Sequence, residues 1–164
     1  MSEELYAPAR IRVLPSWLLG RAAAHGHRLV AQALAGEGVR MMHHAVLASV
    51  AELGPVSQAD LARVLRVDPK DMVATLRELR RHGWVTSTPD PADRRKNAIA
   101  ITPAGTGLLH RTERLGDQAN ARLTAALTPA ERDQLTHLLG RILAHAAATE
   151  QPRRSQAGEG TGGA

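Results

Sequence analysis

The chain has 164 residues, a formal net charge of +5 and a sequence pI of about 10.9. This length allows one well-packed core with appended helices, and the positive charge favours a polyanionic partner such as nucleic acid or an anionic membrane surface. The absence of Cys excludes disulfides and thiolate metal sites, and without a signal peptide or an apolar run of about 20 residues we expect a cytoplasmic protein with no membrane span.

Two helices are predicted in the first third of the chain. Residues 1–14 show no clear period and read as an N-terminal extension. Pro15 is suited to a first helical turn, so a helix is expected over residues 15–34. A second helix over 39–53 places apolar residues on one face and stops at Gly54 and Pro55.

A helix-turn-helix is predicted next. Ser57 and Asp60 have the spacing of a capping box, which favours a short helix over residues 58–65. Asp68 is a good N-cap and Pro69 fits the first helical position, so a second helix is expected over 69–82. Two short capped helices joined by a tight turn at residues 66–67 are typical of this motif.

The second helix of the motif is predicted to have two unlike faces. Apolar residues recur at helical spacing and should face the core: Met72, Val73, Leu76 and Leu79. The opposite face is mostly cationic and suits a phosphate-lined groove: Lys70, Asp71, Ala74, Arg77, Arg80 and Arg81.

A β-hairpin with a basic tip should follow, and then two long helices. The strands are expected near 84–88 and 98–101, with Arg94, Arg95 and Lys96 between them. A helix is expected over 103–123, and a capping box at 128–131 opens the last helix. That helix carries one long apolar stripe, formed by Leu135, Leu138, Leu139, Ile142, Leu143 and Ala146.

The order of these elements predicts a mainly α fold with a small β-hairpin wing, that is, a winged helix-turn-helix binding double-stranded DNA. Near the start of the recognition helix Lys70, Asp71, Ala74 and Thr75 are expected to meet base edges in the major groove. Arg77, Arg80 and Arg81 are expected to meet phosphates. In the wing, Arg94 should enter the minor groove while Asp93 holds Arg95, and Arg95 and Lys96 are also expected to bind DNA.

Residues 90–105 resemble the wing signature of the MarR family of transcriptional regulators, and segments 58–62 and 79–85 extend the likeness. The resemblance implies a homodimeric repressor on a palindromic operator, with dimerisation helices at 15–54 and 103–149 around a winged helix at 55–102. The polar and Gly-rich composition of the C-terminal residues predicts a disordered tail at 150–164. Where many members carry Thr and Arg inside the recognition helix, this chain has Val73 and Ala74, which leaves fewer base-reading side chains.

The resemblance also implies a small anionic aromatic ligand that relieves DNA binding. Trp17, Arg21 and His25 share one helix face and offer a ring, a cation and an imidazole, and His43 or His44 on the next helix are further candidates. The alternative is structural, with Trp17 in the dimer core and the polar side chains in ion pairs or cap contacts.

Three other functions are weighed against DNA binding. The histidines are not placed for local chelation, and no nucleophile, phosphate loop or carboxylate pair is recognisable, so no metal, cofactor or enzyme activity is expected. No helix combines a basic face with an exposed aromatic one, which argues against a membrane surface. The remaining alternative is a winged-helix protein-interaction module, but such a module should show an apolar or acidic recognition face.

Overall fold

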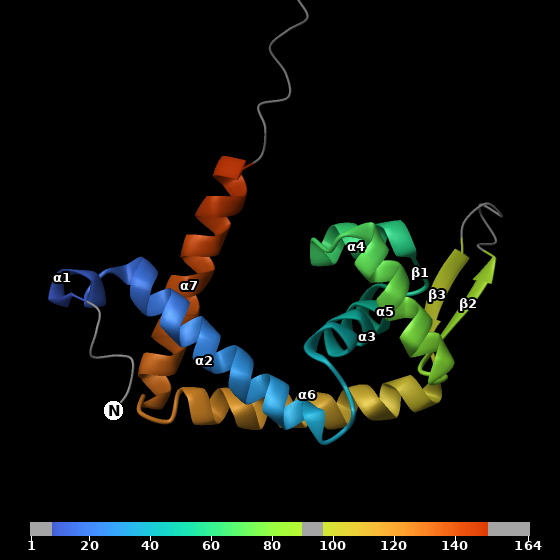
Figure 1. Cartoon of the computed structure of the whole chain (residues 1–164), viewed down its shortest axis with the longest axis horizontal. Helices are drawn as coiled ribbons and strands as arrows, with labels where there is room; N and C mark the ends of the chain where they lie inside the picture. The colour runs from blue at the N-terminus through green and yellow to red at the C-terminus, as the bar shows by residue number, and fades with distance from the viewer. Residues whose placement is uncertain (1–7, 90–96, 151–164) are drawn as a thin grey trace, which may run out of the picture. The chain divides into compact units, whose positions relative to one another are not determined.

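The computed structural model of the chain describes residues 8–89 and 97–150, which form two compact units, the first ending at Leu123 and the second beginning at Thr124. The first unit contains six helices and three short strands within the described residues (Figure 1). Its elements are α1 (Ala9–Arg12), α2 (Pro15–Ala35), α3 (Met41–Leu53), β1 (Val56–Ser57), α4 (Gln58–Leu65), α5 (Pro69–Arg81), β2 (Val85–Pro89), β3 (Asn97–Ile101) and α6 (Pro103–Leu123).

The helix-turn-helix is built from local side-chain caps, as the sequence predicts. The Ser57 hydroxyl accepts the Asp60 backbone N–H at 3.2 Å and so caps α4. The helix ends at Arg66, whose φ of 51° lies in the left-handed region and turns the chain sharply. The Asp68 carboxylate then accepts the Lys70 backbone N–H at 2.8 Å, which starts α5 with Pro69 in its first turn.

The sheet has three antiparallel strands in the order β1-β3-β2, so it is larger than the predicted hairpin by one strand. β2 and β3 pair from Val85 with Ile101 to Pro89 with Asn97, and β1 pairs Val56 with Ile99 on the other edge of β3. A two-residue strand is too short to show an alternating pattern in the sequence. β1 is recognised as a strand only because it pairs with β3. This mainly helical architecture with a small sheet confirms the predicted fold class.

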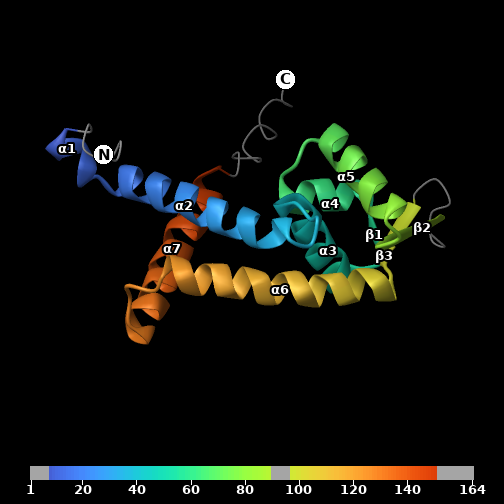
Figure 2. The same cartoon turned by 60° about the horizontal axis from the view of Figure 1, so that its bottom comes forward.

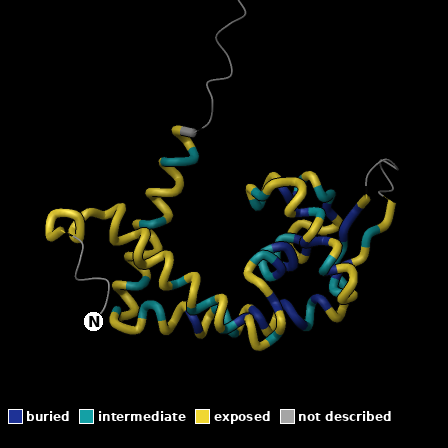
Figure 3. Tube along the Cα trace, viewed as in Figure 1, coloured by how far each residue is buried: buried dark blue, intermediate teal, exposed yellow. Residues whose placement is uncertain are grey.

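Within the described residues, an apolar core joins α3, α4, α5, the sheet and the first half of α6, which contributes Leu108 and Leu109. Figure 3 shows the buried stretches of the chain gathered in this region. We call α3 through β3 the winged lobe. α3 buries Val46, Leu47 and Val50 in the same cluster as Met72 and Leu79 of α5. α3, which is predicted from the sequence to belong with the dimerisation helices, therefore supplies one wall of this core.

α2 packs along α6 and extends beyond the winged lobe (Figure 2). The two helices approach closely at Gly26, where an added Cβ would lie 3.0 Å from the Leu123 side chain. Near the lobe, Arg111 of α6 donates to Glu37 at 3.0 Å, just after the end of α2. The α2 and α6 helices thus form one packed pair that continues into the lobe.

The second unit contains α7 (Pro129–Glu150). The predicted capping box is present: the Thr128 backbone N–H donates to Glu131 Oε2 at 2.7 Å, and the Glu131 N–H donates to the Thr128 hydroxyl at 3.3 Å. The Thr128 hydroxyl also donates to Glu131 Oε2 at 2.8 Å. The two bonds that the carboxylate accepts, from the backbone and the hydroxyl of Thr128, hold the pKa of Glu131 below its usual value. Among the described residues no helix is both long and apolar enough to cross a membrane.

Candidate nucleic-acid interface

α5 has the two unlike faces that the sequence predicts. Met72, Leu76 and Leu79 are buried in the core. The exposed residues include the six predicted to face DNA: Lys70, Asp71, Ala74, Arg77, Arg80 and Arg81. The spacing of Lys70, Ala74, Arg77 and Arg81 places them along one side of the helix, so α5 presents a row of cations with one small gap at Ala74.

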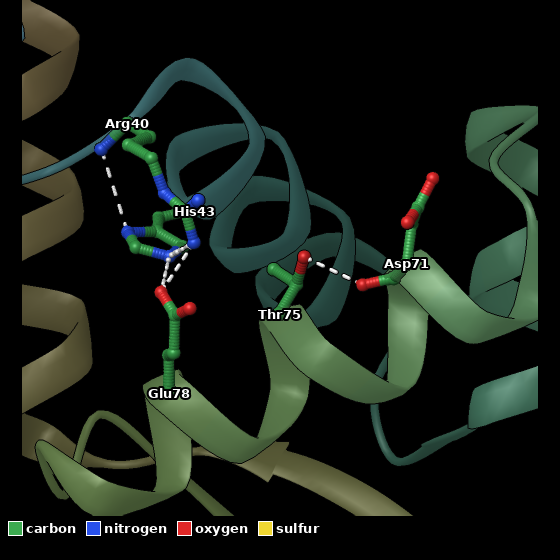
Figure 4. A network of polar contacts seen from close by, with 5 residues as sticks. All are labelled: Arg40, His43, Asp71, Thr75 and Glu78. Atoms are coloured by element: carbon green, nitrogen blue, oxygen red, sulfur yellow. Dashed lines mark hydrogen bonds and ion pairs between the residues drawn. The ribbon is translucent and has the colours of Figure 1, made fainter.

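Thr75 is not on that surface, and the prediction that it meets base edges is wrong. Its side chain is 5% exposed, and its hydroxyl donates to the Asp71 carbonyl oxygen at 2.9 Å (Figure 4). A residue three positions after Met72 and one before Leu76 falls on the core side of a helix. A threonine is small enough to satisfy its hydroxyl there by bonding back to the preceding turn.

The strands of the wing are described, whereas its predicted tip is not. β2 and β3 are paired as far as Pro89 and Asn97. Residues 90–96 lie outside the described part of the chain, and with them the predicted DNA contacts Arg94, Arg95 and Lys96 and the predicted bond from Asp93 to Arg95. These contacts therefore stay predictions.

The base of the wing is fixed to the end of α5 by Thr102. Its hydroxyl donates to the Gly83 carbonyl oxygen at 2.7 Å and accepts the Gly105 backbone N–H at 3.0 Å. The Thr102 backbone N–H donates to the Trp84 carbonyl oxygen at 3.1 Å. One threonine therefore joins the end of the recognition helix, the last strand and the start of α6.

A polar network that no sequence pattern above predicts connects α5 to the start of α3 (Figure 4). Glu78 Oε2 accepts from the Arg40 guanidinium and lies 2.9 Å from His43 Nε2. His43 is 4% exposed, and burial lowers its pKa below the usual value although the hydrogen bond to Glu78 acts in the opposite direction. Glu78 and His43 are 35 positions apart in the chain, so only the packing of α5 on α3 brings them together.

The five predicted ligand residues are not gathered within the chain. Trp17, Arg21 and His25 are exposed on the first half of α2, and His25 lies ten residues, or roughly 15 Å, before the end of that helix. His43 is committed to Glu78, and His44 Nδ1 lies 2.8 Å from the Thr112 hydroxyl. The two histidines of α3 therefore serve contacts inside the first unit, and the prediction that they face Trp17 is wrong for a single chain.

An open hollow of about 350 Å³ lies between α4 and the start of α5, and none of the five predicted ligand residues lines it. Its walls are Gln58, Ala59, Ala62, Arg63, Val67 and Pro69. Within the part of the chain that the structure describes, no three His, Asp or Glu side chains are grouped so that they could hold a metal ion.

Comparison with known proteins agrees with this geometry. The family model of a winged helix DNA-binding domain matches residues 40–105, which span α3 to the start of α6. The multiple antibiotic resistance protein MarR of Salmonella typhimurium is 32% identical over 99 residues, covering 60% of this chain and 69% of the relative. A transcriptional regulatory protein for the hcr operon of Thauera aromatica is 31% identical over 106 residues, and the chain spans 64% of its length.

Solved structures extend the likeness beyond the winged lobe. A mutant MarR from E. coli in complex with operator DNA superposes with a TM-score of 0.72 at 25% identity, covering 84% of this chain and 99% of that chain. CouR from Rhodococcus jostii, bound to p-coumaroyl-CoA, gives a TM-score of 0.71 at 28% identity and covers 82% and 95%. The coverage includes helices on both sides of the lobe.

Proposed function

The chain belongs to the MarR family of winged-helix transcriptional regulators, and from that premise we propose that it is a homodimeric repressor that occupies a palindromic operator. The observation that carries the proposal is the exposed row of Lys70, Arg77 and Arg81 on a helix whose other side is locked into the core. An α-helix fits the major groove, and cations along it neutralise phosphates on either side.

Sequence preference should come mainly from the first half of α5. Lys70, Asp71 and Ala74 are exposed where a recognition helix approaches base edges, and Ala74 can contact a thymine methyl group but donates no hydrogen bond. Arg77, Arg80 and Arg81 are nearer the phosphates in this arrangement. The wing adds Arg94 in the minor groove, with Asp93 holding Arg95 and Lys96 beside them.

A dimer is supported by apolar side chains at both ends of the chain. In the first unit, α1, the start of α2 and the two residues between them expose Ile11, Val13, Leu14, Trp17, Leu18 and Leu19. In the second unit, α7 exposes Leu135, Leu138, Ile142 and Leu143 on one stripe. Exposed apolar stripes of this length are typical of faces that pack against a partner. A second copy of the chain would cover both, and would place two recognition helices about one turn of DNA apart.

A small aromatic acid is the proposed inducer. CouR, which this chain resembles, is named in complex with p-coumaroyl-CoA. In this chain Trp17, Arg21 and His25 are exposed at i, i+4 and i+8 of α2, so a ring, a cation and an imidazole lie along one face. Because His43 and His44 are committed elsewhere, the rest of the site would come from other residues or from the second copy.

The experiment that tests the function is footprinting on the DNA immediately upstream of the chain's own gene, followed by gel shifts on the protected segment. We expect a symmetric footprint, and weaker binding by Arg94→Ala with an unchanged circular dichroism spectrum. Absence of any protected segment contradicts the proposal, and full affinity of Arg94→Ala contradicts the wing contact. Salicylate and other aromatic acids should release the protein from the DNA. An unchanged gel shift across a panel of such acids would contradict the proposal that an aromatic acid is the inducer.

A further inference from the structure

The contact between the recognition helix and the start of α3 converges on one carboxylate. Arg40, the N-cap residue of α3, donates its guanidinium to Glu78 Oε2, and His43 Nε2 lies 2.9 Å from the same oxygen (Figure 4). The Arg40 guanidinium also lies 3.0 Å from His43 Nε2. We call these three residues the Arg40–His43–Glu78 latch.

One protonation state of His43 satisfies the backbone and Glu78 together. The Arg40 backbone N–H donates to His43 Nδ1 at 3.4 Å, so Nδ1 must carry a lone pair. The proton of the neutral ring then lies on Nε2, from which it is donated to Glu78. A proton added at Nδ1 would face the Arg40 N–H and place a second cation beside the guanidinium. This geometry agrees with the burial that lowers the pKa of His43.

The latch also fixes the position of the negatively charged Glu78 carboxylate of α5. Glu78 follows Arg77 directly and would weaken the attraction of this cationic helix for phosphate if its carboxylate lay beside the exposed row. Desolvation opposes the ionisation of Glu78, but hydrogen bonds from His43 and Arg40 outweigh it and hold the pKa of Glu78 below the usual value. The carboxylate is therefore ionised, and its charge is held by the bonds to Arg40 and His43 at the start of α3.

Apolar contacts alone would let α5 rotate and slide slightly against the core, and the latch restricts these movements. Leu76 and Leu79 press α5 against the core, but packing of leucines tolerates small rotations and slides of a helix. Hydrogen bonds are directional, and two donors meeting one carboxylate oxygen define the position of that oxygen far more narrowly. The base-reading residues Lys70 and Ala74 lie on the same rigid helix as Glu78, so a rotation at Glu78 displaces them too.

We infer that the Arg40–His43–Glu78 latch positions the recognition helix, setting its rotation against α3 so that its first half meets base edges in register. The inference rests on the proposed function, because it takes α5 as the helix that reads DNA. Arg40, His43 and Glu78 are positioning residues, which act on sequence preference without contacting a base.

The main test compares Glu78→Gln with Glu78→Ala, which remove the same charge. Gln keeps an oxygen that accepts from His43 and Arg40, whereas Ala keeps none. We expect the ratio of operator affinity to non-specific DNA affinity to fall about tenfold in Glu78→Ala and to stay near the wild-type ratio in Glu78→Gln. Equal ratios in the two variants would show that the hydrogen bonds accepted by residue 78 do not set the ratio, and would overturn the inference.

A double-mutant cycle shows whether Arg40 and Glu78 act as one unit. Arg40→Ala should lower the same ratio, and the double variant Arg40→Ala with Glu78→Ala should lower it no further than the larger single loss. Additive losses would contradict a shared latch. Melting temperatures measured on all variants ensure that each is compared in its folded state, and Glu78→Gln provides the folded reference if Glu78→Ala does not fold.

A measurement without DNA separates failure of the inference from failure of the proposed function. The pKa of His43, followed by NMR titration of the imidazole protons, should be lower in Glu78→Gln than in the wild-type protein, because the carboxylate stabilises the imidazolium. An unchanged His43 titration overturns the latch, whereas absence of DNA binding by the wild-type protein overturns the proposed function.

Discussion

A Cβ atom added to Gly105 would lie 2.1 Å from the carbonyl oxygen of Trp84. Gly105 is in the first turn of α6, and Trp84 is in the segment that leaves the recognition helix and enters β2. The side chain of Ile101 also approaches this glycine, and its Cγ1 would lie 2.9 Å from the added Cβ. Only a residue without a side chain lets α6 begin this close to the base of the wing.

The first prediction follows from this contact. Gly105→Ala should destabilise the protein by about 3 kcal/mol, because backbone as well as side-chain atoms must move to admit the methyl group. Urea unfolding measures the change. The matched control is Gly116→Ala in the same helix, where an added Cβ meets nothing within 4 Å of the chain and should stabilise by about 1 kcal/mol. Similar effects of the two substitutions would show that the close approach does not exist in solution.

The second prediction concerns Thr75. Since its hydroxyl is buried and bonded to the Asp71 carbonyl, Thr75→Val should leave the base preference of the protein unchanged and alter stability by about 1 kcal/mol or less. Selection of bound sequences from a randomised DNA pool measures the preference. Ala74→Thr, one position earlier on the exposed face, should change that preference. A changed base preference in Thr75→Val would show that Thr75 takes part in DNA recognition after all.

The third prediction concerns the cations of α5. Arg77→Ala should weaken operator and non-specific binding to similar extents and reduce the slope of log affinity against log salt by about 1, because one fewer counterion is released. Arg122→Ala removes the same charge from the exposed surface of α6, about 19 residues and roughly 28 Å along the helix from the wing, and should leave the slope unchanged. If Arg77→Ala keeps the wild-type slope, Arg77 makes no phosphate contact.

The fourth prediction concerns the apolar stripe of α7. Ile142 is 53% exposed, and Ile142→Glu should convert the proposed dimer to monomer, because the carboxylate would be buried without a partner in the interface. Analytical ultracentrifugation measures the mass. His137→Glu introduces the same side chain on the opposite face of the helix and should remain dimeric. Dimers of equal stability in both variants would place the interface elsewhere.

Much of the winged lobe could be predicted from sequence because its elements begin and end on local chemistry. Ser57 and Asp68 cap α4 and α5 through bonds to backbone groups two or three residues away, and the described helix bounds agree with those predicted. Thr128 and Glu131 open α7 in the same way. Such bonds depend on spacing along the chain alone, so a pattern of residues suffices to identify them.

The contacts that the sequence did not reveal are those between elements. β1 exists as a strand because Val56 pairs with Ile99, and Glu78 is tied to α3 because α5 packs there. Periodicity separated a cationic side of α5 from an apolar one, but it could not assign Thr75, which lies where the two sides meet and whose small polar side chain suits either.

The sequence by itself thus determined the helix-turn-helix, the hairpin, the basic surface of α5 and the apolar stripe of α7, since each depends on spacing within one element. Tertiary structure alone decided that α3 belongs to the winged lobe, that His43 and His44 are used inside the first unit, and that Gly105 must lack a side chain. The physical reason is that the burial of a side chain and the identity of its hydrogen-bond partner depend on which two elements pack together. That packing exists only after the chain has folded.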